Sequence, residues 1–465
     1  MNGNPAAAVR RRARNQEPAR SPNAARKAPV CRRGRSPRAA DNDKGKAACP
    51  TRGKVPACHK PCGPLPAPDR VKAASPQRPA AAARARAPAK IKAGKGAPHS
   101  PERVLQSTLE SLKIRKKARG DVAGEVNKIV EGIIKHLKTK SDCFSEIEKL
   151  PTGSYYENVK ISEPNEFDVM LTVPVQRVEL QEFDSEGAFY SVSFKRNPQK
   201  RPLDRFVLND RTISANKMLK DFRNHIKQAT ASVSSVKLER KKAGCPAVTL
   251  LMKVKGREVG LDIVLGLKVH AQSWPTITKD GFNIDGWLGT KVKQEFKRCP
   301  FYLVPKYVGK GTDEKHGVCA KDTWRISFSH VEKGILKNHG FAKTCCESGG
   351  SQCCRKQCLK LLKCLLQKLK EKHPELAKFF SYQAKTALLH ACVKRPQDSD
   401  WEIKELDDCF QQFLDDFIQY LKAGDLPHFF IPTYNLLYST TKSHRQFLIK
   451  CIEEQRNNRF PVFRN

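Results

Sequence analysis

The sequence Thr-Gly-Ser at 152–154, followed by Glu-Phe-Asp-Val-Met-Leu at 166–171, is the stretch that decides the fold. Its alternation of acidic and apolar residues predicts a strand on which Glu166 and Asp168 point to the same face. Two like charges on one face of an otherwise apolar strand repel each other unless a cation lies between them. Carboxylate oxygens suit Mg²⁺ or Mn²⁺, with nucleotide phosphates completing the coordination shell.

A third acid, Asp262, lies in the apolar run 259–265. That run predicts a buried strand, where an unpaired carboxylate is costly. Three acids on neighbouring strands are what two-metal phosphoryl transfer requires. Gly153 and Ser154 supply the complement, because glycine lets backbone N–H groups approach a phosphate closely and the serine hydroxyl can add a bond to it. Together the turn and the three acids resemble the signature of the nucleotidyltransferase superfamily.

The surrounding pattern predicts an α+β protein with two lobes. Helical periodicity begins at Pro101 and continues to Leu137, and we expect Gly120 to bend or interrupt this long helix. After Trp287 the helical pattern returns. The expected strands are 167–173, 189–194, 247–254 and 259–265, and the clearest later helices are 354–369, 407–421 and 444–453.

Charge and aromatic residues divide the chain near residue 100. The first hundred residues carry 24 basic and 4 acidic side chains and contain no Phe, Tyr or Trp. Such a segment cannot bury enough apolar surface to offset the entropy lost on ordering, so we expect a disordered basic tail at 1–100. A catalytic lobe with the long helix is expected at 101–290, and a helical lobe at 291–465.

Net charge and cysteine content indicate the partners and the compartment. The formal charge is +40, which in a protein inside the cell favours contact with nucleic acid or anionic membrane surfaces. We see no export signal and no apolar run long enough to span a membrane. With 17 cysteines, we therefore expect reduced thiols and an intracellular location.

One His and four Cys are crowded into residues 339–354. Tetrahedral zinc takes four nitrogen or sulfur ligands, and a Gly-containing loop can wrap such an ion. We predict one structural Zn²⁺ in the loop 339–353, and basic residues along the helix that follows predict a nucleic-acid surface beside it. The expected ligands are His339, Cys345, Cys346 and Cys353.

Longer motifs carry a closer resemblance, which runs from about residue 101 to the C-terminus. In these motifs and in its His/Cys loop, the chain is similar to the vertebrate cyclic GMP-AMP synthases, which belong to the Mab-21-like family of nucleotidyltransferases. The motifs are Gly-Ser-Tyr-Tyr-Glu (153–157), Pro-Asn-Glu-Phe-Asp-Val-Met (164–170), Ser-Trp-Pro (273–275), Phe-Tyr-Leu-Val-Pro-Lys (301–306), Trp-Arg-Ile-Ser-Phe-Ser-His (324–330) and Arg-Asn-Asn-Arg-Phe-Pro-Val-Phe (456–463).

This resemblance implies an enzyme that double-stranded DNA activates, whatever the DNA sequence. It would join ATP and GTP into a cyclic dinucleotide with one 2′–5′ and one 3′–5′ linkage, a messenger of innate immunity. Glu166, Asp168 and Asp262 would hold catalytic Mg²⁺ or Mn²⁺. The nucleotide-binding residues implied by position are Thr152, Gly153, Ser154, Arg325, Ser327, Ser329, Glu332, Lys363, Ser381, Tyr382 and Lys385.

The resemblance further implies a homodimer on DNA, in the cytosol and nucleus. Nucleosomes and the inner face of the cell membrane would be further contacts of the basic regions. The lysines that would touch DNA or the dimer partner are Lys113, Lys116, Lys333, Lys343, Lys356 and Lys360.

Two other functions stay open on the sequence. One is a nucleic-acid-binding protein with a vestigial active site, against which the intact acids argue. The other is an RNA-activated oligoadenylate synthetase, against which the His/Cys loop argues.

Overall fold

The computed structural model describes residues 100–113, 116–161, 165–195, 202–208, 211–270, 273–347 and 350–464. Side chains at 116–119 are not part of that description. The described residues belong to one compact unit, Ala89–Asn465. The tail expected at 1–100 lies outside the described residues, apart from its last residue.

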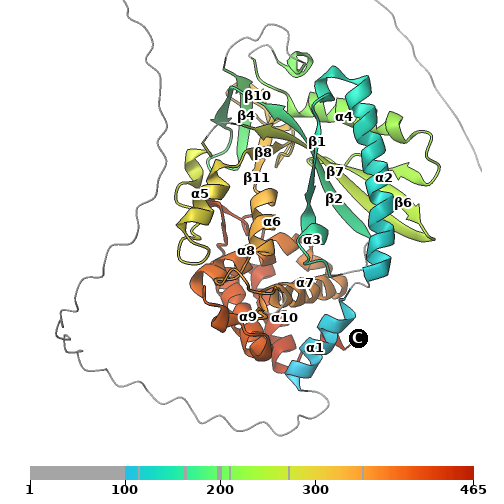
Figure 1. The fold of residues 1–465 in the computed structure, drawn as a ribbon. Helices are drawn as coiled ribbons and strands as arrows, with labels where there is room; N and C mark the ends of the chain where they lie inside the picture. The colour runs from blue at the N-terminus through green and yellow to red at the C-terminus, as the bar shows by residue number, and fades with distance from the viewer. Residues whose placement is uncertain are drawn as a thin grey trace, which may run out of the picture. The chain divides into compact units, whose positions relative to one another are not determined.

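A mixed sheet forms the first layer of the structure (Figure 1). Its strands run in the order β1-β2-β7-β8-β11-β4-β3, with β6 also paired to β7 and β5 to β6. Two short hairpins, β9–β10 and β12–β13, lie outside this sheet. The strands are β1 Glu148–Thr152, β2 Glu166–Val175, β3 Val178–Glu182, β4 Phe189–Phe194, β5 Val236–Leu238, β6 Ala247–Val254, β7 Arg257–Val269, β8 Phe301–Val304, β9 Glu314–Lys315, β10 Val318–Cys319, β11 Trp324–Ser327, β12 Pro427–His428 and β13 Ile431–Asn435.

Helices cover the sheet and build the second lobe. The predicted α+β fold with a helical C-terminal region is confirmed. The α-helices are α1 Pro101–Ser111, α2 Lys116–Lys140, α3 Gly153–Tyr156, α4 Ala215–Thr230, α5 Thr290–Arg298, α6 Ser329–Lys337, α7 Arg355–Lys372, α8 Ser381–Lys394, α9 Leu406–Ala423 and α10 Lys442–Asn457. Short 3₁₀ helices, among them η1 Asp142–Phe144 and η6 Asp398–Trp401, connect several of these elements.

The sheet extends past the lobe boundary expected at residue 290. Strands β8 and β11 both follow that point, and β8 pairs antiparallel with β7 and with β11. The sequence pattern after Trp287 was assigned to helices, and β8 and β11 were not recognised because each strand has only four residues. Such short, buried strands give no readable alternation.

The first helix breaks earlier than expected. Residue 120 lies inside α2, and the interruption falls between Ser111 and Lys116. A single glycine costs a helix only about 1 kcal/mol, whereas the Lys- and Arg-rich run at 113–119 places like charges one turn apart. The two helices also pack differently: α1 contacts α7 and α9 of the helical lobe, and α2 contacts α4 beside the sheet.

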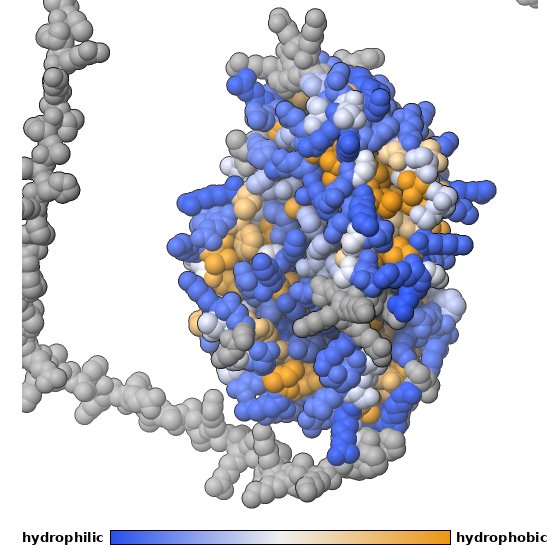
Figure 2. Space-filling view, turned by 45° about the vertical axis from the view of Figure 1, so that its right-hand side comes forward, coloured by the Kyte–Doolittle hydropathy of each residue, from blue (hydrophilic) through white to orange (hydrophobic). Residues whose placement is uncertain are grey.

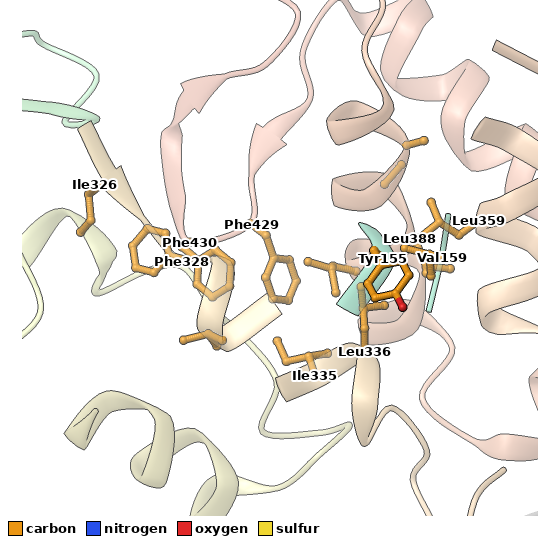
Figure 3. Close-up of a cluster of buried hydrophobic side chains, with 14 of the residues drawn as sticks. Tyr155, Val159, Ile326, Phe328, Ile335, Leu336, Leu359, Leu388, Phe429 and Phe430 are labelled. Atoms are coloured by element: carbon orange, nitrogen blue, oxygen red, sulfur yellow. The ribbon is translucent and has the colours of Figure 1, made fainter. Parts of the chain in front are cut away.

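A cluster of aromatic side chains joins the two lobes (Figure 3). Phe328, which precedes α6, stacks on Phe430 of the β12–β13 hairpin, with ring centroids 4.3 Å apart and planes 10° from parallel. Phe282 and Trp274 pack against the same pair at 5.1 and 5.2 Å. Burial of these rings fixes the hairpin against the end of β11.

The surface is largely hydrophilic on the face shown in Figure 2, where apolar groups form small separate patches. Among the described residues, none of the helices has the length and apolar content needed to cross a membrane.

Replacing Phe430 by alanine should lower the free energy of unfolding by about 3–5 kcal/mol, because a fully buried ring leaves a cavity. Urea denaturation measures this change. As a control, Phe341→Ala removes a ring that is 52% exposed and should change stability by no more than about 0.5 kcal/mol. Equal effects of the two substitutions would contradict the role given to the aromatic cluster.

Candidate active site and metal cluster

Two of the three predicted acids lie side by side. Strands β2 and β7 are parallel, and their register sets Asp168 opposite Asp262. Burial, followed by the negative charge of Asp262, raises the pKa of Asp168 from its ordinary 3.8 to about 6. The hydroxyl of Thr249 on β6 donates to Asp262 Oδ1 at 2.6 Å. A cation between the two carboxylates would relieve this repulsion, so the pair is suited to a divalent metal.

The third acid, Glu166, is placed differently. It begins β2, and its side chain is 79% exposed. Its carboxylate accepts a hydrogen bond from the buried Lys160 ammonium at 3.2 Å. The structure therefore groups two acids at adjacent strand positions and leaves the third at the edge, two residues from Asp168.

The predicted Gly-Ser turn packs directly on this acidic pair. Gly153 begins α3 with φ +83°, a backbone conformation that disfavours any residue with a Cβ. A Cβ there would lie 2.1 Å from Asp168 Oδ2. The residue before it, Thr152, pairs with Asp168 across β1 and β2. Glycine at 153 is thus required both by the backbone and by the carboxylate.

A cavity of about 790 Å³ opens beside the turn and reaches into both lobes. Its volume is within the usual range for small-molecule sites. Of the predicted nucleotide-binding residues, Ser154, Lys363 and Ser381 do not line it. The predicted site residues that do line it are Thr152, Gly153, Asp168, Arg325, Ser327, Ser329, Glu332, Tyr382 and Lys385.

Lys363 lies beside the cavity on α7, and its ammonium donates to the carbonyl of Val159 at 2.7 Å. Burial, followed by the charge of Lys385, lowers the pKa of Lys363 to about 8. Ser381 is exposed at the first position of α8. Ser154 follows Gly153 in α3, where its carbonyl accepts from the Val159 amide at 3.0 Å.

A buried hydrogen-bonded chain occupies the inner wall of the cavity. Lys385 donates to Glu157 at 2.8 Å and to Glu332 at 2.9 Å. Tyr382 contacts Glu332 at 2.7 Å and His428 Nε2 at 2.8 Å. Burial opposes the charge on Lys385, but Glu332 and Glu157 together hold its pKa above its ordinary value. We call these five residues the Glu157–His428 chain.

Sequence reasoning missed three residues of this site. Glu157 was present in the Gly-Ser-Tyr-Tyr-Glu motif and Lys306 in the Phe-Tyr-Leu-Val-Pro-Lys motif, and these motifs were the available signals. His428 comes from the β12–β13 hairpin and carried no local pattern. Lys306 also lines the cavity, where the charge of Arg325, followed by burial, lowers its pKa to about 8.

The four predicted His/Cys ligands converge, with their ligand atoms all within 4.8 Å of one another. His339 Nε2 lies 3.2 Å from Cys353 Sγ, and Cys346 Sγ lies 3.7 Å from the same sulfur. Because His339 Nδ1 bonds the Leu336 carbonyl at 3.1 Å, Nε2 is free to face the sulfurs. Three thiols and one imidazole form a donor set that could hold a metal ion, and tetrahedral Zn²⁺ fits it.

Surrounding contacts position this metal cluster. Trp287 Nε1 donates to the His339 carbonyl at 2.9 Å. Asp398 accepts from the backbone amides of Phe341 and Ala342 at 3.0 and 2.9 Å. The buried Arg355 side chain donates to Asp398 at 2.6 Å. The loop is therefore anchored to α7 and η6 by polar contacts outside the four candidate ligands.

The predicted DNA-contacting lysines lie on five parts of the chain. Lys343 is exposed on the His/Cys loop, and Lys356 and Lys360 are half-buried on α7 directly after it. Lys333 on α6 donates to the Pro151 carbonyl at 3.0 Å. Lys113 follows α1 and pairs with Glu110, and Lys116 begins α2.

Comparison with known proteins agrees with this geometry. Residues 155–338 match the Mab-21 protein nucleotidyltransferase domain, and residues 354–454 match the Mab-21 protein HhH/H2TH-like domain. Cyclic GMP-AMP synthase of Mus musculus is 45% identical over 82% of this chain and 74% of its own length. The Sus scrofa enzyme of that name is 46% identical over 81% and 74%. A cyclic GMP-AMP synthase-like receptor of Magallana gigas is 25% identical over 70% and 54%.

The sheet, the paired acids and the Gly-Ser turn thus define a nucleotidyltransferase, and the prediction of an enzyme is confirmed. The chain belongs to the Mab-21 family and, within it, to the cyclic GMP-AMP synthases. This membership overrides both alternatives, the vestigial binding protein and the oligoadenylate synthetase.

Replacing Gly153 by alanine should reduce the rate of nucleotidyl transfer by about 100-fold or more, because a displacement of about 1 Å at reacting groups costs that much. Steady-state kinetics with purified protein measures it. Gly256→Ala is the matched control, since Gly256 has a similar φ of +78° but nothing within 4 Å of an added Cβ. Comparable rate losses in both variants would show that backbone strain alone, and not contact with Asp168, explains the requirement.

Proposed function

We propose that this enzyme is activated by double-stranded DNA and makes a cyclic GMP-AMP messenger with mixed 2′–5′ and 3′–5′ linkages from ATP and GTP. Its role would be innate immune sensing of DNA in the cytosol. The observation that carries the proposal is Asp168, which lies against the Gly153 turn at the wall of a cavity of about 790 Å³ and pairs with Asp262 on the next strand. The similarity to named synthases supports the choice of product.

Asp168 and Asp262, joined by Glu166, would hold Mg²⁺ or Mn²⁺. When bound, these ions would supply the charge that lowers the pKa of the attacking hydroxyl and neutralises the leaving pyrophosphate. Thr249 fixes the orientation of Asp262 through its 2.6 Å bond, and the turn at Gly153 offers backbone N–H groups to phosphate.

The remaining cavity residues would bind the nucleotides. Lys363 and Ser381 would reach the triphosphate, with Lys385 close by. Arg325 on β11 would contact a nucleotide, and the hydroxyls of Ser327 and Ser329 bond each other at 2.6 Å at the end of the same strand. Tyr382 would stack on a base, while its hydroxyl stays anchored to Glu332.

DNA would bind through phosphate contacts. The candidate lysines lie on several elements, and no one of them presents the side chains of a base-reading helix. Phosphate contacts position a protein on DNA but carry no direct sequence information. We propose a homodimer on DNA, a location in the cytosol and nucleus, and further contacts of the basic regions with nucleosomes and the inner membrane surface.

The loop at 339–353 would hold one structural Zn²⁺ and brace the basic start of α7. Purified protein should therefore contain about one zinc per chain, and Cys346→Ala should remove most of it and lower DNA-stimulated activity. Plasma mass spectrometry of the metal content tests this. The control is Cys358→Ala, a buried thiol on α7 outside the cluster, which should keep its zinc. Active protein without zinc would rule out this role.

Product formation from ATP, GTP and Mg²⁺ should depend on duplex DNA and not on duplex RNA, as followed by mass spectrometry. Changing Lys356 and Lys360 together to Glu should remove most of the stimulation and reduce the slope of log affinity against log salt by up to about 2, since each neutralised phosphate contributes about 0.9. Lys422→Glu with Lys450→Glu makes the same charge change at exposed positions of α9 and α10 and should leave both quantities unchanged.

Stimulation by duplex RNA of equal strength would contradict the proposed activator. A strong preference for one defined DNA sequence over a scrambled duplex of the same composition, at fixed salt, would contradict the phosphate-contact interface.

A further inference from the structure

The Glu157–His428 chain has a fixed direction of hydrogen bonding. His428 Nδ1 accepts from the backbone amides of Phe430 and Ile431 at 3.2 and 3.3 Å. The neutral ring therefore carries its proton on Nε2 and donates it to the Tyr382 hydroxyl. Tyr382 in turn donates to Glu332 at 2.7 Å. Glu332 is thus held by one hydroxyl and one ammonium, and the chain ends at Glu157.

Glu157 is the unusual member of the chain. Its side chain is 1% exposed, and it lines the nucleotide cavity. One carboxylate oxygen accepts from Lys385, but the other, Oε2, is buried and has no hydrogen-bond partner among the described residues. Two carboxylates also face a single ammonium, so these three groups carry a net charge of −1. Burying such a charge is costly, and the further cations near Glu157 include Lys363, whose pKa the charge of Glu157 raises against the effect of burial.

The position of Glu157 in the chain connects it to the acidic pair. Its backbone amide, at the end of α3, donates to the Gly153 carbonyl at 3.1 Å. Gly153 in turn lies against Asp168. Around α3, Tyr155 and Val159 lie in the same buried cluster as Leu359 of α7 and Leu388 of α8 (Figure 3). Glu157 is therefore a polar link between the Gly-Ser turn and the helical lobe, beside the contact of Lys363 with the Val159 carbonyl.

We propose that Glu157 is a positioning residue: it holds Lys385 across the boundary between the lobes and, through its backbone, keeps the Gly153 turn in register with that ammonium. The inference rests on the proposed function, since it assumes that Lys385 meets a nucleotide in the cavity. Holding Lys385 between two carboxylates weakens its attraction for phosphate and fixes its place. Glu157 thus lowers the affinity of the cavity for the nucleotide and fixes the geometry at the reacting groups.

Removing the charge of Glu157 should separate these two effects. In Glu157→Gln, Lys385 keeps only Glu332 as a charged partner, so the dissociation constant for a non-hydrolysable ATP analogue with Mg²⁺ should fall by about 3- to 10-fold. The turnover number should fall by about 10-fold or more, because Lys385 loses one of the two carboxylates that fix its place. Calorimetry measures the first quantity and steady-state kinetics the second, with DNA present in both.

Two further variants keep the experiment decisive. Glu157→Asp retains the carboxylate on a shorter side chain and should restore the wild-type affinity while recovering only part of the turnover. Glu125→Gln makes the same chemical change at an exposed position of α2 and should alter neither quantity. Thermal melting reports whether each variant folds.

An unchanged or weakened affinity in folded Glu157→Gln would overturn the inference, as would a fall in turnover that merely follows the loss of folded protein. Failure of the proposed function looks different. In that case the wild-type enzyme would bind the analogue but make another product or ignore DNA, and the comparison of affinities would still decide the role of Glu157.

Discussion

Repulsion between Asp168 and Asp262 is the constraint on which the active-site end of the molecule depends. The parallel register of β2 and β7 forces these carboxylates into neighbouring positions. Burial, followed by the charge of Asp262, raises the pKa of Asp168 from 3.8 to about 6, so ionising Asp168 in the folded protein costs about 3 kcal/mol more than in water. The fold keeps the two carboxylates close in spite of this cost because the pair is suited to bind a divalent cation. Gly153, Thr152 and Thr249 are then explained as the groups that pack on the pair or orient it.

Basic side chains of both lobes lie in or beside the same cavity. Lys363 and Lys385 come from α7 and α8 of the helical lobe, and Arg325 comes from β11 of the sheet. Two of the lysines in and beside the cavity, Lys306 and Lys363, have a pKa lowered to about 8, so each gains from an anion nearby. A cavity lined by both acidic and basic side chains matches a nucleotide triphosphate that is bound together with metal.

Local patterns in the sequence indicated the candidate site residues better than the residues that hold those side chains in position. Glu166, Asp168, Asp262 and the His/Cys loop were readable because acids in apolar strands and thiols around glycine are locally anomalous. The strands β8 and β11 were not readable, since each has four residues. His428 and Glu157 could not be assigned a role, because their contacts come from residues distant in sequence. The break before α2 accompanies a run of like charges and the packing of α1 on the helical lobe, and helical periodicity does not record that packing.

Anomalous diffraction from crystals of the protein soaked in Mn²⁺ tests the role of the acidic pair most directly. A peak should lie between Asp168 and Asp262, about 2.0–2.2 Å from an oxygen of each carboxylate. Soaking with a non-hydrolysable nucleotide should place its phosphates on the same ion. A well-ordered nucleotide in the cavity with no peak between these two carboxylates would contradict the conclusion that their repulsion exists to hold a metal.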